Sequence, residues 1–459
     1  MLFCGIIAYF YSESVWPFVI SGSISLSIGL FLYFVARRQN IYDIVNRREA
    51  YITVVLSWLV ICLVGSLPYI ISNSIPSYVD AIFESVSGFT TTGSSILMEI
   101  EILPKSILFW RSLTHWIGGL GIIVLVIIIM PSLNMGSYYL FSLESSLQER
   151  IHPQLQSVGY RLLLIYLLLT ITEVLLLLLG NMNLFESVCH AFGTIATGGF
   201  SPKNTSISEY SPYVQYVVMI FMFLSGTSFV VHYHLMKRNF KRVRENEEFW
   251  FYSIMVILIG AVVTGSLFFT MHKSLEVSFR EGFFQVISIV TCTGYATEDY
   301  LLWPEFAWMI IFFAMLLGGS TGSTAGGIKM VRHLVVMKNI INTFRQLAAP
   351  KAVLSLRLNN KPLPEEANSS ILAFILTYIL VLLAGSLLLI MLGIDYKTAS
   401  SSVATCMAGI GPGIGTVGPA NNFAHLPDTA KFILSFLMIA GRLEIYTILI
   451  LFSVDFWKM

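Results

Sequence analysis

Long apolar segments separated by short polar stretches run along almost the whole chain. Most of them reach the ~20 residues that an α-helix needs to cross the hydrocarbon core of a bilayer. The pattern therefore predicts an all-α protein that crosses a membrane many times. The segments cover residues 16–36, 50–72, 105–131, 159–180, 211–236, 249–271, 304–345 with an interruption, 369–393 and 429–457.

The first 14 residues, MLFCGIIAYFYSES, form a shorter apolar stretch. They have neither the basic flank nor the small-residue cleavage site of a signal peptide. The stretch is also short for a membrane span. We expect it to be part of a tenth spanning segment.

Four further stretches, at 79–92, 184–197, 276–293 and 395–410, are too short to span but recur between similar neighbours. The first three begin with an acid (Asp80, Glu186 and Glu281). A negative charge suits a helix N-terminus because it interacts favourably with the positive end of the helix dipole. This internal repeat predicts four units of spanning helix, short helix, Thr/Gly loop and spanning helix. Aligned on Gly93, Gly198, Gly294 and Gly411, the stretches read DAIFESVSGFTTTG, ESVCHAFGTIATG, EGFFQVISIVTCTG and ASSSVATCMAGIG.

Four such loops in one chain can surround one axis. Irregular backbone at membrane depth persists only where it is buried in protein or lines a watery cavity. Its carbonyl oxygens can then replace the hydration shell of a cation, as in a potassium-channel filter. Loops that merely pack together are the alternative, but fourfold recurrence favours a pseudo-fourfold pore. The predicted ion-binding residues are Thr91, Thr92, Gly93, Ala196, Thr197, Gly198, Cys292, Thr293, Gly294, Gly409, Ile410 and Gly411.

The repeat divides the chain into five predicted parts. Residues 1–49 form an N-terminal helix pair with a loop, and the four pore repeats cover 50–135, 136–240, 241–360 and 361–459. Composition agrees with a membrane protein, because only 12% of residues are charged, against about 25% in soluble proteins. A net charge of +1 gives no sign of nucleic-acid binding.

The Lys and Arg residues are shared unequally between the two sides of this predicted membrane topology. Because cytoplasmic loops are enriched in Lys and Arg, we expect both termini in the cytoplasm and the four short segments to enter from outside. The cytoplasmic side holds 19 of the 27: Arg37, Arg38, Arg47, Arg48, Arg150, Arg161, Lys237, Arg238, Lys241, Arg242, Arg244, Lys329, Arg332, Lys338, Arg345, Lys351, Arg357, Lys361 and Lys458.

Motifs for other chemistry are absent from the sequence. The five cysteines form no CxxC pair, so they indicate neither a disulfide framework nor a metal site. There is no HExxH motif and no paired nucleophile and base, and we expect the protein not to be an enzyme. Without GxxxxGK[ST] or a strand-associated GxGxxG, no nucleotide or other cofactor is expected.

Residues 318–327, GGSTGSTAGG, interrupt the apolar segment that begins at residue 304. Each of its five glycines costs about 1 kcal/mol relative to Ala inside a helix. A linker between separate helices is the alternative, but no charge appears from 306 through 328. We predict a flexible intramembrane loop below the filter, and no other interruption of this kind. Its residues are Gly318, Gly319, Ser320, Thr321, Gly322, Ser323, Thr324, Ala325, Gly326 and Gly327.

Arg442 falls inside the last apolar segment, in IAGRLEIYTIL. An arginine in the middle of a membrane helix is costly and usually faces a cavity or a partner. On a continuous helix, Glu444 would point in another direction. Two interpretations stay open: an ion pair with another helix, and a fixed positive charge below the filter that opposes cations.

The ordered series of these motifs closely resembles the TrkH/KtrB/HKT superfamily of potassium transporters, and the TrkH family within it. The resemblance covers essentially the whole chain, and the helices before residue 50 resemble the extra domain of that family. It rests on SGFTTTGSS, RSLTHWIGGLGIIVL, TIATGGFSP, TCTGYAT, GGSTGSTAGGIKMVR and GIGPGIGTVGP. The fourth loop, AGIGPG, departs most from the T-x-G pattern, so equal coordination by all four loops is not implied.

The resemblance implies a protein of the bacterial cytoplasmic membrane that takes up potassium, the transported ligand. Glycine at all four filter positions implies potassium over sodium. By the same resemblance, 318–327 is a gating loop, Arg442 is a barrier to cations, and the protein is a homodimer in lipid. The implied partner is a cytoplasmic, nucleotide-binding regulator of the TrkA type. The basic stretches 237–244 and 329–361 are candidates for its docking surface.

Two alternatives remain. A secondary transporter with substrate binding at the membrane midplane also has broken helices, but it predicts inverted halves with two interrupted helices in corresponding positions. The sequence instead has four parallel repeats and one evident interruption. Coupling of the cation to a proton is a kinetic property on which the sequence is silent.

Overall fold

A computed structural model describes residues 1–38, 47–124, 154–352 and 354–458. Over these ranges the regular secondary structure is helical except for one short hairpin, β1 (Arg357–Leu358) paired with β2 (Lys361–Pro362). Five of the described helices are long and apolar enough to cross a membrane, or seven if two bent pairs are counted as spans. The predicted all-α, multi-pass class is confirmed.

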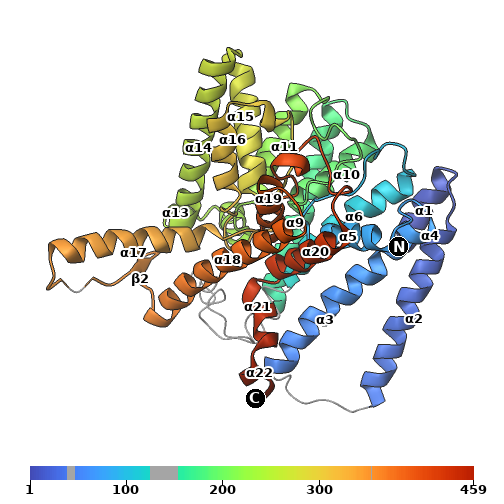
Figure 1. Ribbon diagram of the computed structural model, residues 1–459, viewed down its shortest axis with the longest axis horizontal. Coiled ribbons are helices and arrows are strands. Elements are labelled where there is room, and N and C mark those ends of the chain that lie inside the picture. The colour runs from blue at the N-terminus through green and yellow to red at the C-terminus, as the bar shows by residue number, and fades with distance from the viewer. Residues whose placement is uncertain (39–46, 125–153, 353, 459) are drawn as a thin grey trace.

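The helices form four units that repeat one order, and Figure 1 shows them gathered around a common centre. Unit one holds α3 (Arg47–Gly65), α4 (Leu67–Ile71), α5 (Tyr78–Phe89) and α6 (Lys105–Val124). Unit two holds α9 (Gln154–Leu179), α10 (Leu184–Ile195), α11 (Pro212–Ser225), α12 (Phe229–Met236) and α13 (Phe240–Arg244). Unit three holds α14 (Glu247–Met271), α15 (Leu275–Val290), α16 (Glu305–Ala314) and α17 (Met330–Ala348). Unit four holds α18 (Glu365–Met391), α19 (Tyr396–Ala408), α20 (Asp428–Arg442) and α21 (Ile445–Leu449), followed by α22 (Val454–Lys458).

The four short helices α5, α10, α15 and α19 match the four predicted half-length stretches. Each begins at a residue whose side-chain oxygen accepts a hydrogen bond from the first turn, an N-cap that satisfies otherwise unpaired amides. These residues are Ser77, Asn183, Ser274 and Asp395. One detail was wrong: Glu281 is not at the start of α15, which begins at Leu275, and it pairs with Lys273 at 2.6 Å instead.

The second helix of a unit is broken more often than the sequence indicates. Helices α11 and α12 meet at 101°, and α20 and α21 meet at 113°, in addition to the predicted break between α16 and α17. The prediction of a single interruption was therefore wrong. The two missed breaks lack a glycine cluster: one lies at Gly226, and the other at Glu444, whose φ is +62°.

The N-terminal pair, α1 (Leu2–Phe10) and α2 (Trp16–Arg38), packs beside unit one (Figure 1). Glu13, in the turn between α1 and α2, connects this pair to unit one. The carboxylate accepts hydrogen bonds from the backbone N–H groups of Lys105 and Ser106 at 2.6 and 2.9 Å. Because those amides begin α6, Glu13 acts as a cap for a helix of the neighbouring unit.

We predict that Glu13→Ala lowers the stability of the purified protein by about 1–2 kcal/mol, the usual effect of losing a helix cap. Thermal unfolding in detergent measures the change as a lower Tm. Glu13→Gln retains an acceptor oxygen and should lose less. The exposed Glu99 provides a control, and a Glu13→Ala Tm equal to that of Glu99→Ala would contradict a capping role.

Candidate functional site

The loops that follow the four short helices share one backbone conformation. The second residue after α5, α10 and α15, and the first after α19, has a φ between +53° and +71°; these residues are Thr91, Thr197, Cys292 and Gly409. Two residues later comes a glycine with φ of +83°, +80°, +82° and +98°, at Gly93, Gly199, Gly294 and Gly411 respectively. We call these four the ring glycines.

The hydrogen bonds that end the short helices give the same register. The residue before each ring glycine donates its N–H to a carbonyl five residues earlier at 2.8–3.0 Å; the donors are Thr92, Gly198, Thr293 and Ile410. Gly199, rather than Gly198, is therefore the counterpart of Gly93, and the alignment of the second loop was wrong by one residue. The sequence TGG offers two glycines there, and only backbone geometry distinguishes them.

Each ring glycine lies against a carbonyl oxygen of another unit. A Cβ at Gly93 would overlap with the carbonyl oxygen of Gly198, and a Cβ at Gly199 with that of Thr293. A Cβ at Gly294 would overlap with the carbonyl oxygen of Ile410. A Cβ at Gly411 would lie 3.0 Å from the carbonyl oxygen of Thr92. The contacts therefore run from unit one to two, three, four and back to one, which closes a ring of backbone.

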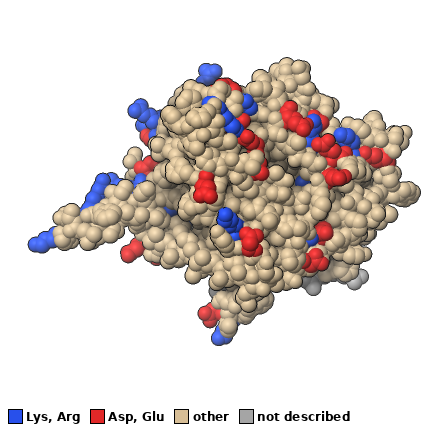
Figure 2. Space-filling view, turned by 45° about the horizontal axis from the view of Figure 1, so that its top comes forward, with Lys and Arg blue, Asp and Glu red and all other residues tan. Residues whose placement is uncertain are grey.

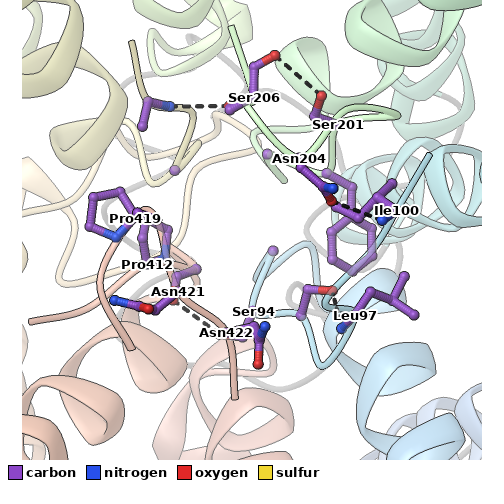
Figure 3. A pocket seen from close by; sticks show the side chains of 18 of the residues that line it. Ser94, Leu97, Ile100, Ser201, Asn204, Ser206, Pro412, Pro419, Asn421 and Asn422 are labelled. Carbon is purple, nitrogen blue, oxygen red and sulfur yellow. Dashed lines mark hydrogen bonds between the residues drawn. The ribbon is translucent and has the colours of Figure 1, made fainter. Parts of the chain in front are cut away.

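A cavity of about 140 Å³, which we call the vestibule, opens beside this ring and is lined by residues of all four units. Figure 3 shows the loops of the four units arranged around it. Its polar lining includes hydroxyl and amide side chains. The labelled ones are Ser94, Ser201, Asn204, Ser206, Asn421 and Asn422. Ser94 Oγ donates to the carbonyl of Gly411 at 3.1 Å, so units one and four are also joined directly.

The glycine-rich break in unit three is a buried loop that extends from the end of α16 to the start of α17, wider than the predicted 318–327. Ser320 N–H donates to the Gly226 carbonyl at 2.8 Å, and the Gly322 carbonyl accepts from Phe229 N–H at 3.0 Å. A Cβ at Gly326 would overlap with the carbonyl of Ala408, the last residue of α19. The loop therefore touches units two and four close to the ring. The other residues predicted for it lie in the same loop: Gly318, Gly319, Thr321, Ser323, Thr324, Ala325 and Gly327.

Arg442 is the last residue of α20 and is not in mid-helix as predicted, because the chain bends there. Its guanidinium donates to the carbonyls of Thr324 and Gly118 at 2.9 and 3.0 Å. Thr324 Oγ1 donates in turn to the carbonyl of Ile195 at 2.9 Å. Residues of units four, three, one and two thus meet at one junction. Within the described residues no carboxylate forms an ion pair with Arg442, which disfavours the ion-pair interpretation.

Two anchors of the loop were missed by the sequence analysis. The buried carboxylate of Glu248 accepts hydrogen bonds from Thr321 N–H at 2.7 Å and Val331 N–H at 3.0 Å, which ties the loop and the start of α17 to α14. Arg332 on α17 pairs with Glu444 at 2.5 Å. Glu248 and Glu444 resemble ordinary charges at helix ends, and the sequence shows no periodic signal that would reveal these contacts.

The corrected register predicts different outcomes at Gly198 and Gly199. A Cβ at Gly198 would overlap with the side chain of His115, whereas Gly199→Ala would meet the Thr293 carbonyl and a φ that disfavours L-residues. We expect either substitution to lower stability by about 1–3 kcal/mol, the cost of local strain. His115→Ala should restore part of the loss at Gly198 and none at Gly199.

A double-mutant cycle on Tm with these three substitutions measures the coupling. The register is supported if His115→Ala offsets part of the Tm loss caused by Gly198→Ala and none of the loss caused by Gly199→Ala. Equal coupling with both glycines would contradict it.

Comparisons with known proteins agree with this architecture. Residues 17–458 match the model of the TrkH family, described as cation transport protein. The Trk system potassium uptake protein TrkH of Escherichia coli K12 is 35% identical over 467 residues, covering 100% of this chain and 96% of that protein. The TrkG protein of the same strain, also named a Trk system potassium uptake protein, is 32% identical over 460 residues, covering 99% and 94%.

A solved structure is equally similar. The crystal structure of the potassium transporter TrkH from Vibrio parahaemolyticus superposes with a TM-score of 0.90 at 32% identity, covering 99% of this chain and 95% of that one. Both the family match and these full-length identities point to one conclusion. The chain belongs to the TrkH family of cation transport proteins.

Proposed function

We propose that this protein takes up potassium across the bacterial cytoplasmic membrane through the ring of filter loops. The observation that carries the proposal is the closed cycle of ring glycines and carbonyls, with one contribution from each unit. Backbone carbonyls on one axis can replace the water around a monovalent cation. The short helices end at the ring, so the negative ends of their dipoles favour a cation there. The names of the relatives, potassium uptake proteins, support the choice of ion.

In this proposal the ring residues, in the corrected register, coordinate the ion with their backbone oxygens. The ion meets Thr91, Thr92 and Gly93 from unit one, and Thr197, Gly198 and Gly199 from unit two. Cys292, Thr293 and Gly294 contribute from unit three, and Gly409, Ile410 and Gly411 from unit four. Ala196 is now assigned to the end of α10. The threonine hydroxyls support the backbone: Thr90 Oγ1 and Thr92 Oγ1 lie 2.8 Å apart, and Thr291 Oγ1 and Thr293 Oγ1 lie 2.9 Å apart.

The loop between α16 and α17 is the proposed gate. It lies against the C-terminal ends of α10 and α19, and Arg442 fixes Thr324 by a hydrogen bond to its carbonyl. The positive charge of the guanidinium also repels a cation at this place, and the low dielectric constant of the protein interior strengthens the repulsion. Opening therefore requires the Arg442–Thr324 contact to break.

A cytoplasmic regulator of the TrkA type is the proposed partner, with both termini of this chain on the same side. The candidate surface is basic: it includes α13 and the arm formed by α17 and the hairpin, which projects from the body in Figure 1. Figure 2 shows Lys and Arg side chains along that arm. Arg345 and Lys351 belong to it and are exposed. Because α17 continues directly from the loop, a force on the arm reaches the gate. We also propose a homodimer in lipid, with one pore in each protomer.

A secondary transporter, including a cation/proton symporter, is the second candidate. Its supporting observation is that three units have broken second helices in corresponding positions. Interruptions alone therefore do not separate the two candidates. The four units repeat in parallel order around one ring, and this arrangement favours the filter. A proton gradient that drives potassium accumulation without a membrane potential would favour the symporter.

The direct test is flux of potassium and sodium into proteoliposomes, with and without the regulator. We expect potassium to permeate in preference to sodium, because four glycines leave the ring backbone free to form a potassium-sized site. Equal permeation of both ions would overturn the proposal.

The gate is tested by two changes in the same assay. Deleting part of 318–327, or replacing Arg442 with Ala, should raise cation flux about tenfold without the regulator, equivalent to about 1.4 kcal/mol of lost closure energy. Arg161→Ala is the control and should leave flux unchanged, because this exposed arginine on α9 donates to Tyr233 Oη at 3.0 Å and not to a residue of the loop. If flux does not rise in well-folded variants, the loop and Arg442 have a structural role only.

A further inference from the structure

A second arginine, Arg111 on α6, lines the vestibule beside the ring. It forms an ion pair with Glu84 on α5, with 2.6 Å between Arg111 Nε and Glu84 Oε1. Glu84 is 0% exposed and Arg111 is 2% exposed. A pair this deeply buried depends on good geometry, because each partner loses most of its hydration.

The Glu84 carboxylate also holds the chain that follows the first ring glycine. It accepts hydrogen bonds from Ser95 Oγ at 3.0 Å and from Ile96 N–H at 3.0 Å. The carbonyl of Ser95 in turn accepts from Phe423 N–H of unit four at 2.9 Å. Glu84 therefore fixes the segment of unit one that follows its ring glycine and contacts unit four.

Arg111 extends the same network into unit two. Its Nη1 donates to the carbonyl of Ser201 at 2.9 Å, and its guanidinium lies 3.7 Å from the ring centroid of Phe200. Phe200 and Ser201 directly follow the ring glycine Gly199. One ion pair thus connects the segments that follow the ring glycines of units one and two. The connection is made by charge-assisted hydrogen bonds, which are stronger than neutral ones.

The other units have weaker contacts at the position that corresponds to Glu84. In unit two, His190 Nε2 lies 3.1 Å from Ser201 Oγ. In units three and four the residues are Gln285 and Ser402, whose buried polar atoms have no hydrogen-bond partner among the residues described. At this level of the ring, the charged side chains that hold the loops in place therefore lie between units one and two.

We infer that the Glu84–Arg111 pair determines ion selectivity by positioning the filter, an inference that rests on the proposed function. The pair sets the spacing between the first two loops at the vestibule end of the ring. Coordination of a dehydrated cation depends on the positions of the carbonyls, so loss of the pair alters which ion fits. Glu84 also neutralises a guanidinium that would otherwise face an entering cation.

The experiment measures the potassium-to-sodium permeability ratio of three full-length variants in proteoliposomes. Glu84→Gln keeps the shape and one acceptor oxygen but removes the charge. Arg111→Lys keeps the charge but removes the fork that reaches both Glu84 and Ser201. Asp80→Asn is the matched control, because Asp80 pairs with Lys431 at 2.5 Å one turn earlier on α5 without contacting a filter loop.

We expect Glu84→Gln and Arg111→Lys to lower the permeability ratio about fivefold or more, the scale of one lost charge-assisted hydrogen bond. Asp80→Asn should keep the ratio of the unmodified protein. Arg111→Lys remains informative if Glu84→Gln does not fold, because it keeps a positive charge beside Glu84 but loses the fork that joins Glu84 to the Ser201 carbonyl.

Two outcomes would overturn the inference: an unchanged ratio in folded Arg111→Lys, or an equal fall in Asp80→Asn, which indicates general loosening of α5. Failure of the proposed function is distinguishable, because the unmodified protein would then already pass both ions equally. A fall in flux with an unchanged ratio would assign the pair a purely electrostatic role at the entrance and also contradict positioning.

Discussion

The close approach of each ring glycine to a carbonyl of another unit is the constraint on which the rest of this structure depends. Three of the four contacts leave no room for a Cβ, and all four glycines have positive φ. The four loops can therefore meet only if these residues are glycine. The short helices, their N-caps and the surrounding spans hold this backbone in place where water is scarce and irregular structure must be enclosed by protein.

Around the ring, buried charged groups connect units that are far apart in sequence. Arg442 joins three units through carbonyl oxygens on one side of the ring, and Thr324 adds the fourth. On the vestibule side, Glu84 and Arg111 connect the loops of units one and two. These groups are few and fully enclosed, so each has a large effect on the relative position of the loops. This division fits the proposed rigid filter and movable gate, because the loop assigned to the gate makes carbonyl contacts with Arg442 and the loops assigned to the filter are joined by an ion pair.

Much of the fold follows from recurrence in the sequence. The four half-length helices were predictable because the same apolar-then-small pattern occurs four times beside long apolar segments. Features that depend on three-dimensional contact were not predictable. The two adjacent glycines at 198 and 199 differ only in φ and in their neighbours. The end of α20 at Arg442 lacks a glycine cluster or proline, and Glu248 gives no sign in sequence that it binds a loop more than 70 residues away.

The central claim is that the four loops form one cation site from backbone oxygens. Anomalous diffraction from crystals grown with thallium ions in place of potassium tests it most directly, because thallium has a similar charge and size and a strong anomalous signal. The account predicts an anomalous peak on the common axis, between the carbonyls of Thr92, Gly198, Thr293 and Ile410. Peaks confined to other places, with the ring empty at saturating thallium, would contradict it.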